Sequence, residues 1–217
     1  MTRILLTLLV ILSFSMLANA QFKKGSLLVG GELSFSSYKT NNSQINQNQH
    51  SGYFNASLGK ALSENSVFGI NLTYAPFSSN NYYPYGSPGS YHSNAYVIGI
   101  FYRIYKTLGK DFYLFGQAGA GYTFSNTTLT DSLGVKQLTN SSNGGQLNFM
   151  PGIAYKISKK LFIEIAIPNI FIVEFSSTRS NSPNNAGYNT TSDDFSVSTS
   201  LNSNPLSALG IGFRLNL

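Results

Sequence analysis

The chain ends in SALGIGFRLNL, residues 207–217, and this stretch decides the fold. Every second residue from Leu209 to Leu217 is apolar, and the residues between them are small or polar. A period of two predicts a β-strand with one apolar face. The strand runs to the last residue, and a free edge strand there would promote aggregation. We therefore expect this strand to pair with the first strand of the chain and to close a barrel.

The same alternation recurs along the chain and predicts an all-β protein with eight antiparallel strands. Pro76 ends the third strand because proline has no N–H to donate to a ladder. Pro168-Asn169 marks a bulge in the seventh strand or the top of its membrane span. The predicted strands are residues 26–37, 52–60, 67–75, 95–105, 111–124, 146–157, 161–175 and 209–217.

The connections between these strands alternate strictly between long and short. The short ones are residues 61–65, 106–110 and 158–160, and the long ones are 38–50, 77–94, 125–145 and 176–204. Short periplasmic turns and long extracellular loops are typical of up-and-down barrels in the bacterial outer membrane. The sequence therefore predicts an eight-stranded transmembrane β-barrel with both termini in the periplasm.

Composition and the N-terminus agree with that location. Charged residues make up only 10% of the chain, aromatic residues 14%, and there is no cysteine. Arg3, an apolar run from Ile4 to Leu17 and the small residues Ala18 and Ala20 form a signal peptide cleaved before Gln21. We expect residues 1–20 to be this signal and residues 21–217 to be the barrel domain.

Charges inside the strands are few, and all fall on the face predicted to point inward. They are Glu32, Arg103, Glu164 and Arg214. An eight-stranded barrel is filled by its own side chains, so we expect a packed polar lumen. A buried charge needs a partner, which predicts a Glu32–Arg214–Glu164 network that Arg103 reaches from across the lumen. Inward glycines such as Gly210 would leave room for the long arginine side chains.

Aromatic residues on the outward face gather near the strand ends, as in the girdles of outer-membrane barrels. The predicted girdle residues are Tyr74, Tyr96 and Tyr122 on the long-loop side, and Tyr102, Phe112 and Tyr155 on the short-turn side.

Three segments carry a resemblance to a known family. They are residues 112–122 (FYLFGQAGAGY), residues 151–157 (PGIAYKI) and the closing strand 209–217. With these, the mature chain resembles the small outer-membrane barrels of the OmpA/OmpX-like, or porin-family, type. The resemblance implies no shared catalytic residues. It also implies recognition of the closing strand by the barrel-assembly machinery through a terminal aromatic, whereas this chain ends in Leu217.

The leading functional hypothesis is a non-enzymatic barrel that contributes to envelope integrity or to surface contact through its loops. We expect no catalytic residue, cofactor, metal or nucleic acid. The expected partners are outer-membrane lipids, lipopolysaccharide, the assembly machinery and an unspecified extracellular ligand, with the chain as a monomer. Three alternatives stay open: a lipid-modifying enzyme using His50 or His92 with Ser51, Ser93 or Asp193-Asp194, a small-solute pore, and a secreted barrel of lipocalin type.

Overall fold

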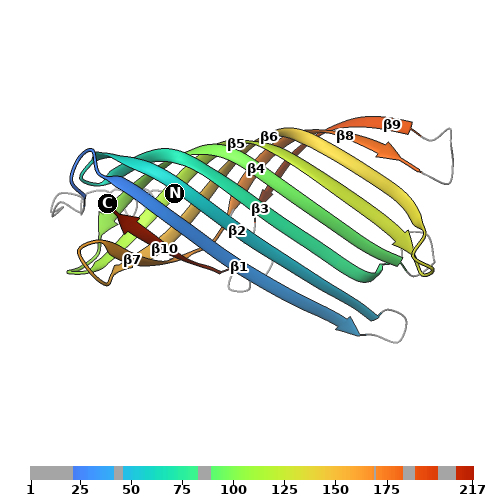
Figure 1. Ribbon diagram of the computed structural model, residues 1–217, viewed down its shortest axis with the longest axis horizontal. Coiled ribbons are helices and arrows are strands. Elements are labelled where there is room, and N and C mark those ends of the chain that lie inside the picture. The colour runs from blue at the N-terminus through green and yellow to red at the C-terminus, as the bar shows by residue number, and fades with distance from the viewer. Residues whose placement is uncertain (1–21, 42–45, 83–88, 169, 183–188, 200–208) are drawn as a thin grey trace, which may run out of the picture.

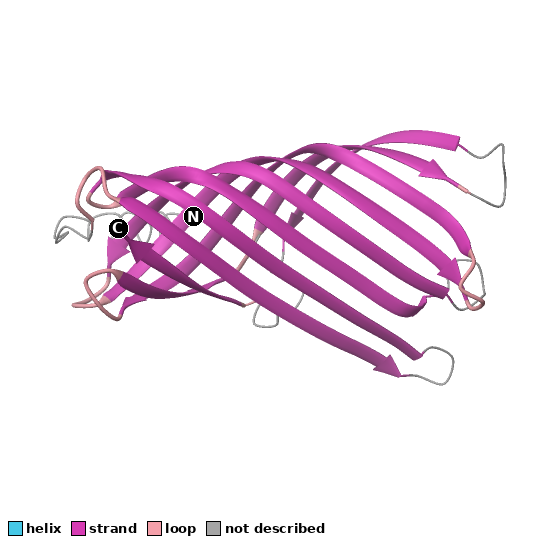
Figure 2. Cartoon of the chain, in the orientation of Figure 1, coloured by secondary structure: helices cyan, strands magenta, loops and turns pink. Residues whose placement is uncertain are grey.

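The computed structural model describes residues 22–41, 46–82, 89–168, 170–182, 189–199 and 209–217. These residues form one antiparallel sheet rolled into a barrel (Figures 1 and 2). In the described ranges no helix is long and apolar enough to cross a membrane. The predicted signal peptide and its cleavage residues Ala18, Ala20 and Gln21 lie outside the described residues. The strands are β1 (Leu27–Asn41), β2 (Asn46–Ser63), β3 (Ser66–Tyr82), β4 (Gly89–Thr107), β5 (Phe112–Asp131), β6 (Lys136–Lys156), β7 (Leu161–Ala166), β8 (Phe171–Asn181), β9 (Asn189–Thr199) and β10 (Gly210–Asn216).

The last strand closes the barrel, as its alternating pattern predicts. β10 pairs with β7 on one side and with β1 on the other, so β1 to β7 and β10 form a ring. The pairing of β1 with β10 covers Leu28 to Leu33. Just beyond it, the hydroxyl of Ser34 donates to the carbonyl oxygen of Leu209 at 3.1 Å. Closure therefore gives β10 a partner on each edge.

The strands continue well past their predicted ends on the side opposite the short turns. β1 and β2 stay paired up to Asn41 and Asn46, and β4 and β5 up to Gly89 and Asp131. Most residues expected in long loops are therefore in strands that project as hairpins at the right of Figure 1. The alternation ends there because both faces of the hairpins are polar, but the backbone ladder does not need an apolar face to continue.

The hairpin between β5 and β6 ends in a turn held by one side chain. The Asp131 carboxylate accepts hydrogen bonds from the N–H groups of Leu133 and Val135 at 2.9 and 2.8 Å. The Gln137 amide donates to its second oxygen at 2.8 Å. The N–H of Val135, with Gln137 and Leu133, lowers the pKa of Asp131 below its usual value. Gly134 has φ of +79°, which glycine adopts without strain.

The predicted seventh strand is two strands in the structure. β7 pairs with the part of β6 nearer the short turn, residues 152–156, and β8 pairs with the part nearer the hairpin tip, residues 139–149. Strand pairing is interrupted between β7 and β8, around Pro168. β9 then pairs with β8, so these two strands form a hairpin of their own above β7 (Figure 1). The interruption matches the position where Pro168-Asn169 predicts a bulge, because a proline there donates no hydrogen bond.

The two faces of the wall differ as the alternation predicts. Along β4, the side chains of Ile98, Ile100 and Ile104 are exposed, whereas Phe101 and Arg103 are 1% and 2% exposed. An apolar band thus surrounds the outside of the barrel between the short turns and the hairpins. Large outward side chains of this band include Leu58, Ile70, Leu72, Tyr102, Leu114, Leu147, Ile153, Ile163 and Ile211.

Gly69 lies where β2, β3 and a lumen side chain approach closely. A Cβ at Gly69 would lie 2.6 Å from the Cα of Gly59 and 2.8 Å from the ring of Phe101. Such overpacking typically costs about 1–3 kcal/mol. We therefore expect Gly69→Ala to lower the urea midpoint of the refolded protein. Gly145→Ala is the matched control, because its Cβ would meet no atom closer than 4.0 Å. Equal midpoints for the two variants would contradict the prediction.

Candidate functional site

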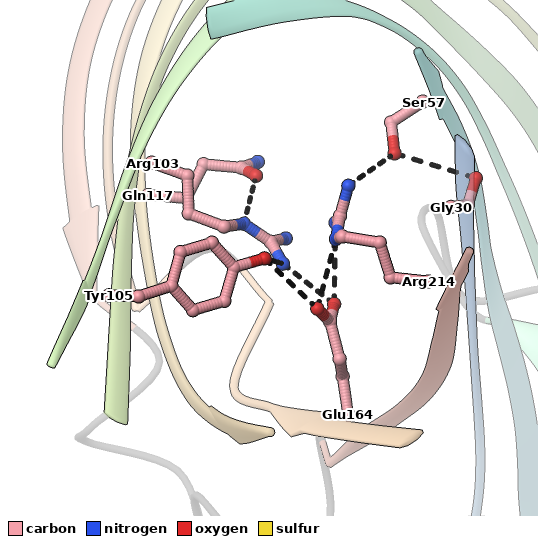
Figure 3. Close-up of polar contacts among 7 residues, drawn as sticks. All are labelled: Gly30, Ser57, Arg103, Tyr105, Gln117, Glu164 and Arg214. Atoms are coloured by element: carbon pink, nitrogen blue, oxygen red, sulfur yellow. Dashed lines mark hydrogen bonds and ion pairs between the residues drawn. The ribbon is translucent and has the colours of Figure 1, made fainter. Parts of the chain in front are cut away.

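A layer of ion pairs crosses the lumen (Figure 3). Glu164 on β7 accepts hydrogen bonds from two arginines, at 2.7 Å from Nη1 of Arg103 on β4 and at 2.9 Å from Nε of Arg214 on β10. All three residues are at most 5% exposed. β7 and β10 are neighbours in the ring and β4 lies across the lumen from them, so this layer ties opposite parts of the wall together.

Neutral groups accept further hydrogen bonds from the two arginines. Arg103 Nε donates to Gln117 at 2.9 Å and its Nη1 to the hydroxyl of Tyr105 at 3.2 Å. Arg214 Nη1 donates to Ser57 at 3.4 Å, and Ser57 donates to the carbonyl of Gly30. Sequence reasoning missed Gln117, Tyr105 and Ser57. Their inward parity was the available signal, because each faces the lumen beside a charged residue.

Glu32, the fourth charged residue expected in the network, lies outside these ion pairs. It sits one inward row nearer the hairpins than Arg214, because β1 pairs Glu32 with Gly212 and Gly30 with Arg214. Its Oε1 is buried and has no hydrogen-bond partner among the described residues. Its carboxyl group occupies the space left by Gly210, where a Cβ would lie 3.2 Å from Cδ of Glu32. Gly210 thus accommodates Glu32 and not an arginine, which corrects the expectation from the sequence.

Beside the ion-pair layer, the lumen holds a buried apolar and aromatic layer, which differs in part from the expected polar interior. Phe22 packs against Tyr105 and Phe162 with ring centroids 5.1 and 5.6 Å apart. Arg103 lies over the Phe115 ring at 4.1 Å, which joins the two layers through a cation–π contact. The apolar layer consists of Phe22, Leu28, Ala61, Val67, Phe101, Tyr105, Tyr113, Phe115, Met150, Ala154, Phe162 and Ala166.

On the outside of the barrel, aromatic rings from adjacent strands form a continuous row at the upper border of the apolar band. We call Phe35, Phe54, Tyr74, Tyr96 and Phe124 the aromatic row. Successive ring centroids are 5.2, 6.0, 5.0 and 5.0 Å apart. The predicted girdle residues Tyr74 and Tyr96 are its centre, and the three phenylalanines are additional members. Of the other predicted girdle residues, Tyr122 and Tyr102 are exposed, and Phe112 packs on Tyr155 at 4.7 Å.

Four residues above the aromatic row, both histidines face outward in one cross-strand row. β3 pairs Ser78 with His50 on β2 and with His92 on β4. The row continues to Ser37 on β1 and Thr128 on β5, and we call these residues the histidine row. Ser37 Oγ lies 3.1 Å from Nδ1 of His50. The sequence carried this signal, since His50, Ser78 and His92 are each four positions from a residue of the aromatic row.

The other residues considered for catalysis do not form a Ser–His–Asp arrangement with the two histidines. Asp193 and Asp194 are on β9, which pairs with β8 and with neither β2 nor β4 among the described residues. Ser93 faces inward and bonds to Thr127 at 2.9 Å. Ser51 has the same inward parity, next to the outward His50. A Ser–His–Asp arrangement needs the three side chains within hydrogen-bond reach of one another, and these positions do not provide it.

Comparisons with known proteins give one family and one fold. The model of the outer membrane protein beta-barrel domain matches residues 6–202. The solved structure of OprG from Pseudomonas aeruginosa is 14% identical, with 92% of this chain and 99% of that chain covered and a TM-score of 0.51. A major outer membrane protein from Thermus thermophilus is 13% identical, with coverage of 88% and 99% and a TM-score of 0.45. The outer membrane protease OmpT from Escherichia coli is 11% identical, with coverage of 88% and 91% and a TM-score of 0.40.

No curated protein sequence matches the chain. At these identities, a likeness to solved structures shows the fold alone, and the likeness to OprG agrees with the ring of paired strands described above. The family model covers most of the sequence, including every strand from β1 to β9. The chain therefore belongs to the outer membrane protein beta-barrel domain family and lies in the bacterial outer membrane.

Proposed function

We propose that the chain is a non-enzymatic barrel that supports the envelope and presents its strand extensions at the cell surface for recognition. The observation that carries this proposal is the continuation of paired strands beyond the aromatic row. β8 and β9 pair from Phe171 and Thr199 to Asn181 and Asn189, and β9 is exposed along its whole length. Paired strands lose little conformational entropy on contact with a partner, because they are already ordered.

The composition of these extensions suits contact with other molecules. The outer parts of β8 and β9 are rich in serine, threonine and asparagine, with Arg179, Asp193 and Asp194 among them. Small polar side chains give adaptable hydrogen bonding at recognition surfaces. In this proposal the barrel is a monomer that contacts outer-membrane lipids and lipopolysaccharide. The barrel-assembly machinery recognises its closing strand, β10.

Shortening the β8–β9 hairpin tests the proposal. A variant lacking residues 178–192, joined by a two-residue turn, keeps the pairing of Phe175 with Phe195 and removes the outer ladder. We expect this variant to fold, to restore dye exclusion in a deletion strain, and to lose adherence of whole cells to glycan-coated wells. Adherence equal to that of the intact protein would rule out surface recognition by this hairpin. Dye entry equal to that of the deletion strain would rule out the envelope role.

We expect the barrel to show no steady conductance in a planar bilayer. The ion-pair layer and the apolar layer beside it lie across the lumen, and their largest side chains, Arg103, Phe101, Phe115 and Phe162, are at most 2% exposed. An eight-stranded barrel is just wide enough to be filled by its side chains. A steady single-channel current from the purified protein would contradict this and would favour the small-solute pore.

A lipid-modifying activity at the histidines is the second candidate, and the contact between Ser37 and His50 is the observation that favours it. The double variant His50→Ala/His92→Ala separates the two candidates. We expect unchanged lipid A and phospholipid profiles by mass spectrometry, because a Ser–His–Asp arrangement needs a carboxylate within reach of the histidine. The carboxylates in strands β1 to β5 are Glu32 in the lumen and Asp131 at a hairpin tip. A lost lipid species, restored by the wild-type gene, would favour the enzyme.

A further inference from the structure

Two grooves run across the outer wall of the barrel, one on each side of the aromatic row. The lower groove has a volume of about 450 Å³, and its floor is made by the small residues Gly31 and Ala56. The upper groove has a volume of about 310 Å³ and lies around Gly52 and Pro76. Phe54 lines both grooves. The two grooves therefore meet at the ring of Phe54, which separates the one near the hairpins from the one in the apolar band.

The walls of the lower groove are apolar. Leu33, Phe54, Tyr74, Tyr96 and Phe124 line it on the side of the hairpins, and Phe213, Leu72 and Ile98 line it on the side of the short turns. These side chains alternate with lumen-facing ones, so they point away from the barrel axis. A groove with this lining in a membrane-facing wall fits a hydrocarbon chain.

The walls of the upper groove are polar on the side away from the apolar band. His50, Ser78 and His92 come from three adjacent strands and line it together with Asn94. Neighbouring strands are about 4.8 Å apart, so the two imidazoles stand on either side of the Ser78 hydroxyl. These groups donate hydrogen bonds, and the N–H of imidazole and a serine hydroxyl both suit phosphate oxygens.

The charges on this part of the wall complement an anion. Lys39 is exposed on β1 with the same outward parity as Ser37 in the histidine row. In β1 to β5 as described, the carboxylates are Glu32 inside the lumen and Asp131, which is engaged with its own turn. The outward upper wall of these strands thus carries cationic and neutral donors without an acid to compete for them.

We propose that this wall binds one phosphorylated glycolipid of the outer leaflet, of the lipid A class. Its phosphate lies against His50, Ser78 and His92, and one acyl chain passes Phe54 into the lower groove. The glycolipid is favoured over a phospholipid because the histidine row is on the hairpin side of the aromatic row. In an outer-membrane barrel that side faces the extracellular leaflet, where phosphorylated glycolipid is the main lipid.

The test is native mass spectrometry of the full mature chain released from detergent micelles with three probe lipids. The probes are bis-phosphorylated lipid A, the same lipid A without phosphates, and phosphatidylglycerol. We expect bis-phosphorylated lipid A to be retained best. We expect His50→Ala/His92→Ala to weaken its binding about tenfold and to leave the dephosphorylated lipid unaffected, since charge-assisted hydrogen bonds to phosphate are lost.

Filling the lower groove tests the acyl-chain contact separately. Ala56→Leu places a larger side chain on the groove floor, and we expect weaker binding of both lipid A forms. Ala118→Leu is the matched control, because Ala118 is an exposed outward alanine of β5 that lines neither groove. Asn126→Ala/Ser141→Ala is the control for the histidine variant, with two outward polar residues on β5 and β6.

Each variant is first shown to be folded by its faster migration in SDS without boiling. Equal retention of bis-phosphorylated lipid A by the wild type and the double histidine variant would overturn the phosphate site. Equal retention of phosphatidylglycerol and lipid A by the wild type would overturn the choice of a glycolipid. Equal losses from Ala56→Leu and Ala118→Leu would overturn the groove as the acyl-chain site.

Discussion

Replacing Glu164 by alanine is expected to destabilise the barrel by about 3–5 kcal/mol, the usual effect of removing one partner from a buried ion pair. Glu164 is the shared acceptor of Arg103 and Arg214, at 2.7 and 2.9 Å. Its removal leaves two buried guanidinium groups without their ion-pair partner. The measurement is the urea midpoint for refolding into lipid vesicles, followed by the migration shift on unboiled gels.

Glu32→Gln is the matched control for Glu164→Ala. Both residues are buried glutamates in the lumen, but Glu32 forms no ion pair among the described residues, and its Oε1 lacks a hydrogen-bond partner there. Replacing its carboxyl group by an amide removes no salt bridge, so we expect a midpoint close to that of the wild type. A larger loss from Glu32→Gln than from Glu164→Ala would show that the lumen network is centred on Glu32.

Placing an arginine at Ile70 is expected to cost about 2–4 kcal/mol, the penalty for a cationic side chain on the lipid face at mid-depth. Ile70 is outward on β3 and 58% exposed. It lies between the outward residues Phe68 and Leu72, well inside the apolar band. The Ile70→Arg variant is expected to refold into vesicles with a lower urea midpoint and to insert more slowly.

Asn80→Arg provides the control on the same strand and the same face. Asn80 is exposed and pairs with Ser90, two positions beyond Ser78 of the histidine row. An arginine there is outside the apolar band, and we expect its effect on the midpoint to be small. If both variants refolded equally well, the assignment of the apolar band as the membrane-facing surface would fail.

The strand pattern was readable because a barrel wall imposes the same requirement on every strand. Lipid on one side and a filled lumen on the other force a period of two, so Ile98, Ile100 and Ile104 could be assigned outward and Arg103 inward from sequence alone. The pattern fades in the hairpins, where water lies on both faces. There, β1, β4 and β5 continue as strands because of their partners, and no local signal records it.

The lumen network shows where sequence reasoning stops. Inward parity placed Glu32, Arg103, Glu164 and Arg214 in one interior, and the structure buries all four. Parity does not give the height of a residue within the lumen, because height depends on the register between strands. Register puts Arg214 beside Gly30 and Ser57, and puts Glu32 one row higher against Gly212 and Asn55.

The sequence by itself determined the fold class, the outward and inward faces and the closing role of residues 209–217, because these follow from a local period repeated along the chain. The tertiary structure alone decided which residues meet across strands. Ser78 between His50 and His92, the aromatic row and the two arginines on Glu164 all depend on register and on barrel closure. Those are set by hydrogen bonds and packing between segments far apart in the chain, so no local pattern encodes them.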